Sequence, residues 1–104
     1  MRSGHLTAGF WVGDWLVEPS LNRMTREDED VAVEPKVMEV LVCLAEQPGR
    51  TVTKDYFFET VWSGMVVTED VLSRCISELR KNLGDDSRDP HYIETIRKTG
   101  YRLL

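Results

Sequence analysis

The chain has 104 residues, of which 41% are hydrophobic and 30% are charged. This size and balance indicate one globular domain with a single core and exclude a disordered or low-complexity chain. The longest apolar run, 40–45, is far too short to cross a bilayer, and no secretory signal is visible. Two cysteines, Cys43 and Cys75, define neither a disulfide framework nor a metal site, so a reducing compartment is expected.

The net charge of −5 is unevenly distributed along the chain. Residues 1–70 carry 6 basic and 13 acidic side chains, a net −7, whereas residues 71–104 carry 7 basic and 5 acidic, a net +2. Binding of a polyanion depends on the local field more than on the total charge. The last third is therefore a candidate binding surface, although the asymmetry taken alone is equally compatible with chance.

The first third of the chain predicts a small sheet. Residues 1–9 have no periodic pattern and are expected to form a flexible N-terminus. The β-prone runs that follow are 10–12, 15–17, 21–25 and 31–33. Gly13-Asp14 is a hairpin turn, and four short runs at this spacing predict an antiparallel sheet. The acidic turn 27–30 would repel a phosphate backbone and is expected to face away from DNA.

Two helices are predicted next. Pro35 suits the first turn of a helix, and Pro48-Gly49 ends it. Its apolar stripe comprises Val37, Val40, Leu41 and Leu44, widened by Met38 and Ala45. Cys43 falls towards the polar side, so its burial is left open. After the extended pair Thr51-Val52, Thr53 caps a second helix, 54–62. Its inward-facing residues are Phe57, Phe58, Val61 and Trp62.

The third helix is predicted over 68–83, with Thr68 as its N-cap and Gly84 as its left-handed stop. Its apolar stripe comprises Leu72, Ile76, Leu79 and Leu83, with Cys75 at the edge as a core thiol. Asp70, Arg74, Ser77 and Lys81 lie opposite, flanked by Ser73 and Glu78. This polar face is either ordinary solvated surface or a surface that contacts the edges of base pairs.

A polar loop, 85–90, leads into a β-hairpin formed by strands 92–96 and 101–104 around the turn 97–100. The turn carries two cations, Arg97 and Lys98. The predicted order is a helix, a tight connection at 63–67, a capped helix and a cationic hairpin. This order is typical of an α+β winged helix-turn-helix domain, which we expect over 10–104. The third helix fits the major groove of DNA.

Two long segments carry a family likeness, ISELRKNLGD (76–85) and PHYIETIRKTGYRL (90–103), and EPKVMEVL (34–41) and Val61-Trp62 support it. Together they resemble the OmpR/PhoB-type winged-helix DNA-binding domain. The resemblance implies sequence-specific binding of double-stranded DNA at promoters or operators by a bacterial transcription regulator. Within the family, the chain most resembles the CadC-like and ToxR-like regulators. In those proteins this domain is N-terminal and does not follow a phosphorylated receiver domain.

The resemblance also implies roles for particular residues. Arg74 would approach base edges, Arg80 and Lys81 would lie near phosphates, and Thr95, Arg97 and Tyr101 would contact the backbone or minor groove. The full predicted set is Trp62, Ser73, Arg74, Ser77, Glu78, Arg80, Lys81, Thr95, Arg97, Lys98 and Tyr101. The loop Ser63, Gly64, Met65, Val66 and Val67 corresponds to a segment that touches RNA polymerase in the family.

Some positions depart from the family pattern. Ser77 and Glu78 replace frequent basic residues, Lys98 replaces a frequent wing glycine, and Asp70 stands where a basic residue can contact phosphate. We therefore expect modest affinity from one domain, with a homodimer or tandem sites supplying the rest.

Simpler interpretations remain beside these roles. Arg74, Arg97 and Lys98 are also compatible with plain solvated surface, and Arg80 with pairing inside the fold, for instance with an acidic side chain of the loop. Tyr101 suits core packing with an exposed hydroxyl, and both of its roles can hold together.

Other classes of function are less favoured by the sequence. His5 and His91 have no partner at ligand or triad spacing, so we expect no enzyme, cofactor, metal or small-molecule substrate. The alternative to DNA binding is a winged helix that serves as a protein-interaction module. We expect a cytoplasmic domain, and the anchoring of the full-length protein in the inner membrane is left open.

Overall fold

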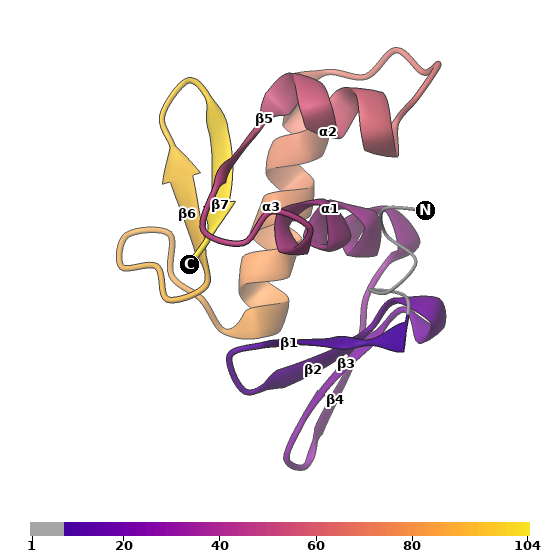
Figure 1. Cartoon of the computed structure of the whole chain (residues 1–104), viewed down its shortest axis with the longest axis vertical. Helices are drawn as coiled ribbons and strands as arrows, with labels where there is room; N and C mark the ends of the chain where they lie inside the picture. Colours follow the sequence, from indigo (N-terminus) through magenta and orange to yellow (C-terminus); the bar gives the residue numbers. More distant parts are fainter. Residues whose placement is uncertain (1–7) are drawn as a thin grey trace.

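The computed structural model describes residues 8–104, so most of the N-terminus predicted to be flexible, 1–9, lies outside the described residues. Two antiparallel sheets and three helices form the predicted α+β winged-helix architecture (Figure 1). The four-stranded sheet lies at the C-terminal end of α3 (Glu69–Leu83), and the hairpin of the second sheet lies beside that helix. No helix within residues 8–104 combines the length and apolar character needed to cross a membrane.

The first sheet follows the chain order β1-β2-β3-β4, as predicted. Its strands are β1 (Phe10–Val12), β2 (Trp15–Glu18), β3 (Arg23–Arg26) and β4 (Glu29–Ala32). The third strand begins two residues later than expected, because the 3₁₀ turn η2 (Pro19–Leu21) occupies the predicted start. The fourth begins two residues earlier, because Glu29 and Asp30 pair with Arg26 and Thr25. The acidic turn therefore shrinks to Glu27-Asp28.

The helices are α1 (Pro35–Ala45), α2 (Lys54–Val61) and α3. The predicted cap of α2 is confirmed, since the Tyr56 amide donates to the Thr53 hydroxyl over 3.2 Å. Thr68 is the N-cap residue of α3, as predicted, but its side chain makes no capping hydrogen bond to any described residue. Instead the Thr68 carbonyl accepts from the Val71 amide. Gly84 ends α3 at φ +75, as predicted.

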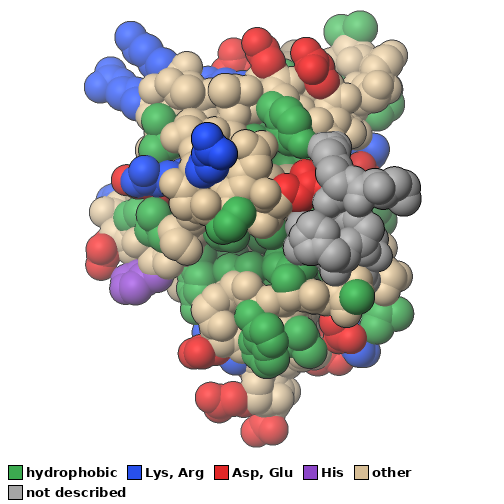
Figure 2. All heavy atoms as spheres, in the orientation of Figure 1, with side chains coloured by type: hydrophobic (Ala, Val, Ile, Leu, Met, Phe, Trp, Pro, Cys, Tyr) green, Lys and Arg blue, Asp and Glu red, His purple; other side chains and the backbone are tan. Residues whose placement is uncertain are grey.

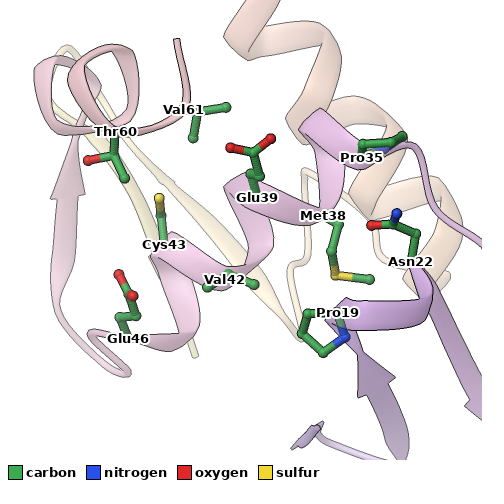
Figure 3. A pocket seen from close by; sticks show the side chains of 10 residues that line it. All are labelled: Pro19, Asn22, Pro35, Met38, Glu39, Val42, Cys43, Glu46, Thr60 and Val61. Carbon is green, nitrogen blue, oxygen red and sulfur yellow. The ribbon is translucent and has the colours of Figure 1, made fainter. Parts of the chain in front are cut away.

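The core lies where the apolar stripes of the three helices meet the first sheet. All four stripe residues of α1 and all four of α3 are buried, and Cys75 is buried with them. Burial raises the pKa of the Cys75 thiol. Cys43 is buried too, because its side chain points from α1 towards α2 (Figure 3). Phe58 is only partly buried, in contrast to its predicted inward orientation, and its ring lies 6.2 Å from that of Trp62.

The second sheet has the order β5-β7-β6, formed by β5 (Thr51–Thr53), β6 (Ile93–Ile96) and β7 (Gly100–Leu103). The turn predicted over 97–100 comprises only 97–99, because Gly100 pairs with Ile96. Lys98 has φ +63, a conformation that favours glycine. On the other side of β7, Gly100 lies opposite Thr53, so β5 joins the predicted hairpin, or wing, to the start of α2.

Candidate nucleic-acid interface

The polar face of α3 is open to solvent while its apolar stripe is fixed in the core. Ser73, Arg74, Ser77 and Lys81 are exposed. Within residues 8–104, neither Arg74 nor Lys81 forms an ion pair, so both cations are available to an external partner. This exposed set matches the face that the helical period predicts, apart from Glu78, which is partly buried.

Contacts at both ends hold α3 in place beneath this face. At its C-terminal end, the Trp15 indole N–H donates to the Leu83 carbonyl oxygen over 3.3 Å in a buried hydrogen bond. At its N-terminal end, the Lys54 ammonium donates to the Glu69 carboxylate over 2.8 Å. The first sheet and α2 therefore both determine how α3 is presented to a partner.

The tip of the wing adds a second group of cations. Arg97, Lys98 and Thr99 are exposed, and neither Arg97 nor Lys98 is ion-paired within the described chain. The Lys54 amide donates to the Thr99 carbonyl oxygen over 3.1 Å and fixes the tip against α2. Figure 2 shows basic side chains at the end of the molecule where the wing tip lies, and acidic ones at the β3–β4 turn at the opposite end.

Arg80 links α3 to the wing. Its Nη2 atom donates to the Ile93 carbonyl oxygen over 3.0 Å and to the Thr95 hydroxyl over 2.8 Å. The alternative in which Arg80 pairs inside the fold is therefore confirmed, but its partners are a carbonyl and a hydroxyl and not an acidic loop residue. Two residues that the resemblance places on DNA thus hydrogen-bond to each other in the free domain.

Asp85 is a structural residue of the interface that the sequence analysis did not identify. Its carboxylate accepts the backbone N–H groups of His91, Tyr92 and Ile93 over 2.7, 3.2 and 2.9 Å. Partial burial raises the pKa of this carboxyl group, but the bonds from these amides, with that of Asp86, outweigh burial and leave the pKa lowered. An aspartate directly after a helix-ending glycine is the one local signal that points to this role.

We expect Asp85→Asn to lower the free energy of unfolding by about 1–2 kcal/mol at neutral pH, because a neutral amide accepts N–H groups less strongly. Since the folded-state pKa lies below that of the unfolded chain, the stabilisation is fully present above the unfolded value of about 3.9. It is lost as pH falls through the folded-state pKa.

Urea titrations of wild type and Asp85→Asn between pH 7 and pH 2 measure this difference. The difference in unfolding free energy between wild type and Asp85→Asn should disappear towards pH 2. The exposed Asp89→Asn change is the matched control and should show no such gap. A gap for Asp85→Asn that stays constant across the range would contradict the role of the carboxylate.

Two predicted contact residues are largely withdrawn from the surface. Trp62 is 5% exposed and Tyr101 is 7% exposed, and the Tyr101 ring meets Phe57 edge-on at 6.2 Å. The core-packing role of Tyr101 is confirmed, and the DNA roles of both residues stay predictions. In the loop 63–67, Met65 and Val66 are exposed and Val67 is partly buried.

The histidines and acidic residues form no evident metal site in the described part of the chain. His91 is exposed, and His5 lies outside the described residues. No group of three or more His, Cys, Asp or Glu side chains within residues 8–104 is arranged to hold a metal ion.

An exposed polar helix face held beside a cationic β-hairpin is the arrangement of a winged helix-turn-helix domain. The chain belongs to the family described as "Transcriptional regulatory protein, C terminal", whose model matches residues 28–103. It is 40% identical over 94 residues to the transcriptional activator CadC of Escherichia coli K12. That match covers 89% of this chain but only 18% of the relative.

Solved structures agree with this assignment. The DNA-binding domain of E. coli CadC superposes with a TM-score of 0.81 at 39% identity, covering 90% of this chain and 89% of that domain. The DNA-binding domain of Klebsiella pneumoniae RstA, solved in complex with the RstA box, superposes with a TM-score of 0.79. It is 24% identical and covers 92% of this chain and 96% of that one, a likeness that supports the fold alone.

Proposed function

We propose that α3 docks in the major groove of double-stranded DNA and that the wing contacts the adjacent backbone or minor groove. The observation that carries this proposal is a set of exposed cations on both elements that form no ion pair within residues 8–104, namely Arg74 and Lys81 on α3 and Arg97 and Lys98 on the wing. The major groove of B-DNA is wide enough to admit a helix. The domain would direct its regulator to promoter or operator sequences.

The charges of α3 limit what the helix does alone. Glu69, Asp70 and Glu78 balance Arg74, Arg80 and Lys81, so the helix is neutral overall. A neutral helix is better suited to selecting a site than to holding the phosphate backbone. We therefore propose that the wing supplies much of the salt-sensitive affinity and that a homodimer or tandem sites add the remainder.

Arg74→Ala is expected to reduce discrimination for a preferred site by about 1–3 kcal/mol, because a bidentate base contact is lost. Lys81→Ala is the matched control. Because Lys81 is proposed to contact a phosphate, its loss should weaken binding to all sequences alike. It should also lower by about 1 the slope of log affinity against log salt concentration. Gel-shift titrations at two salt concentrations, on a duplex selected by wild type from a random pool and on a scrambled duplex, separate these outcomes. Equal losses for Arg74→Ala on both duplexes would count against base reading.

A second role is favoured by the loop 63–67. Val66 is fully exposed and Met65 is 52% exposed, an unusual position for apolar side chains in a loop. We propose that this loop contacts a protein partner, and the family resemblance favours RNA polymerase as that partner. Met65→Ser with Val66→Ser should leave DNA binding unchanged and lower transcription in a reconstituted assay. A loss of DNA binding itself would contradict this separation.

We propose that the domain works in the cytoplasm, where it meets chromosomal DNA. The resemblance to CadC-like regulators implies that the full-length protein is anchored in the inner membrane. Membrane fractionation of the full-length protein tests this part of the proposal, which would fail if the protein stayed in the soluble fraction.

A further inference from the structure

We propose that Arg80 is a positioning residue that fixes the wing relative to α3, so that helix and wing meet DNA as one rigid unit. This inference rests on the proposed DNA-binding function. It assigns Arg80 a task inside the domain, whereas the family resemblance implies a position near phosphates.

Strand β6 lies at the edge of its sheet. In the order β5-β7-β6, and among the described residues 8–104, it pairs with β7 alone. The backbone groups on its other side therefore have no strand partner and must be satisfied in another way. Residues at the end of α3 meet this need.

Ile93, the first residue of β6, has both of its backbone polar groups bonded to residues at the end of α3. Its N–H donates to the Asp85 carboxylate over 2.9 Å, and its carbonyl oxygen accepts from Arg80 Nη2 over 3.0 Å. The Ile93 side chain is fully buried. The base of the wing is thus fixed to the last turn of α3 and to the residue just after its cap.

Arg80 also contacts β6 two residues further along the strand. The same Nη2 atom donates to the Thr95 hydroxyl over 2.8 Å, on the way to the wing tip at 97–99. The Arg80 Nε atom is buried and has no hydrogen-bond partner within residues 8–104. The guanidinium group is therefore held against the strand in a partly buried position.

The consequence is a fixed spacing between the two groups of cations. Arg97 follows Thr95 by two residues, and Arg74 precedes Arg80 by six on the same helix. If Arg80 releases β6, the wing keeps its pairing with β5, the Lys54–Thr99 hydrogen bond and the contact of Ile93 with Asp85. The outer strand β6 can then shift away from α3, and Arg97 no longer meets the phosphate that lies in register with Arg74. The contribution of Arg97 to binding then depends on Arg80.

A double-mutant cycle tests this dependence, with Arg80→Ala and Arg97→Ala as the single changes. Affinities of the 104-residue protein would be measured on the duplex that wild type selects from a random pool. We expect Arg97→Ala to weaken binding about tenfold in wild type and less than about twofold in the Arg80→Ala background, because interacting residues are not additive. An equal loss in both backgrounds, or no loss in wild type, overturns the inference.

Two further variants separate positioning from charge. Arg80→Lys keeps the positive charge but ends one bond short of Nη2, and Thr95→Val removes one acceptor while leaving Arg80 intact. If Arg80 positions the wing, both variants should reduce the loss of affinity that Arg97→Ala causes. Arg80→Lys should still show the wild-type dependence of affinity on salt concentration. If Arg80→Lys behaves as wild type in the cycle, Arg80 acts only through its charge and the inference fails. If wild type itself binds no duplex, the proposed function fails first.

Discussion

Replacing Gly100 with alanine is expected to lower the free energy of unfolding by about 3 kcal/mol or more, the largest loss from a single methyl group in this domain. A Cβ atom at this position would lie 1.9 Å from the Val52 carbonyl oxygen and 3.0 Å from the Thr53 Cα. Both neighbours are backbone atoms of the paired strand β5, so no side chain can move aside. Relief requires β5 to separate from β7, and DNA binding should fall as the wing loses its support.

Gly49→Ala is the matched control for this change. Gly49 has φ +75 and no atom within 4 Å of an added Cβ, so alanine there carries conformational strain without a collision. We expect a loss of only about 1 kcal/mol. Urea unfolding followed by circular dichroism gives both values. Equal losses for the two variants would show that β5 is not tightly paired to β7.

Trp15→Ala is expected to cost about 3–5 kcal/mol, the usual range for removing a large buried aromatic side chain. Trp15 is almost completely buried, and its indole N–H is bonded to the Leu83 carbonyl oxygen at the end of α3. The Arg26 guanidinium lies 4.3 Å from the ring centroid and covers the indole. The change removes packing and leaves a buried carbonyl without its donor.

Trp11→Ala provides the control in the same sheet. The Trp11 side chain is 67% exposed, so its loss should change stability by no more than about 0.5 kcal/mol. Thermal and urea unfolding measure both variants. If Trp11→Ala destabilises the domain as much as Trp15→Ala, the assignment of the two faces of the sheet is wrong.

The features predicted best from the sequence depend on local spacing. The stripe from Leu72 to Leu83, the stop at Gly84 and the hairpin at Gly13-Asp14 each follow from residues close together in the chain, and all are confirmed. Strand limits moved by two residues because η2 and the register of β4 depend on cross-strand pairing. Thr68 occupies the predicted N-cap, but its side chain makes no capping bond to a described residue, because residue preference does not fix where a hydroxyl points.

The features that were missed depend on contacts between distant segments. No local pattern shows that Thr51–Thr53 pairs with β7 or that Cys43 faces α2. The same holds for the binding surface. Its exposed cations follow from the helical period and the hairpin turn, whereas the engagement of Arg80 with Thr95 appears only once the wing packs against α3.

The most direct test of the DNA-binding surface is a map of backbone amide chemical shifts as the selected duplex is added to the 15N-labelled domain. We predict the largest changes in two segments, 73–81 of α3 and 95–98 of the wing, with little change at the acidic turn Glu27-Asp28. The shifts should shrink at high salt, because phosphate contacts release counterions. Changes confined to the loop 63–67 or to the acidic turn, with α3 unaffected, would contradict the proposed docking and favour the protein-interaction module.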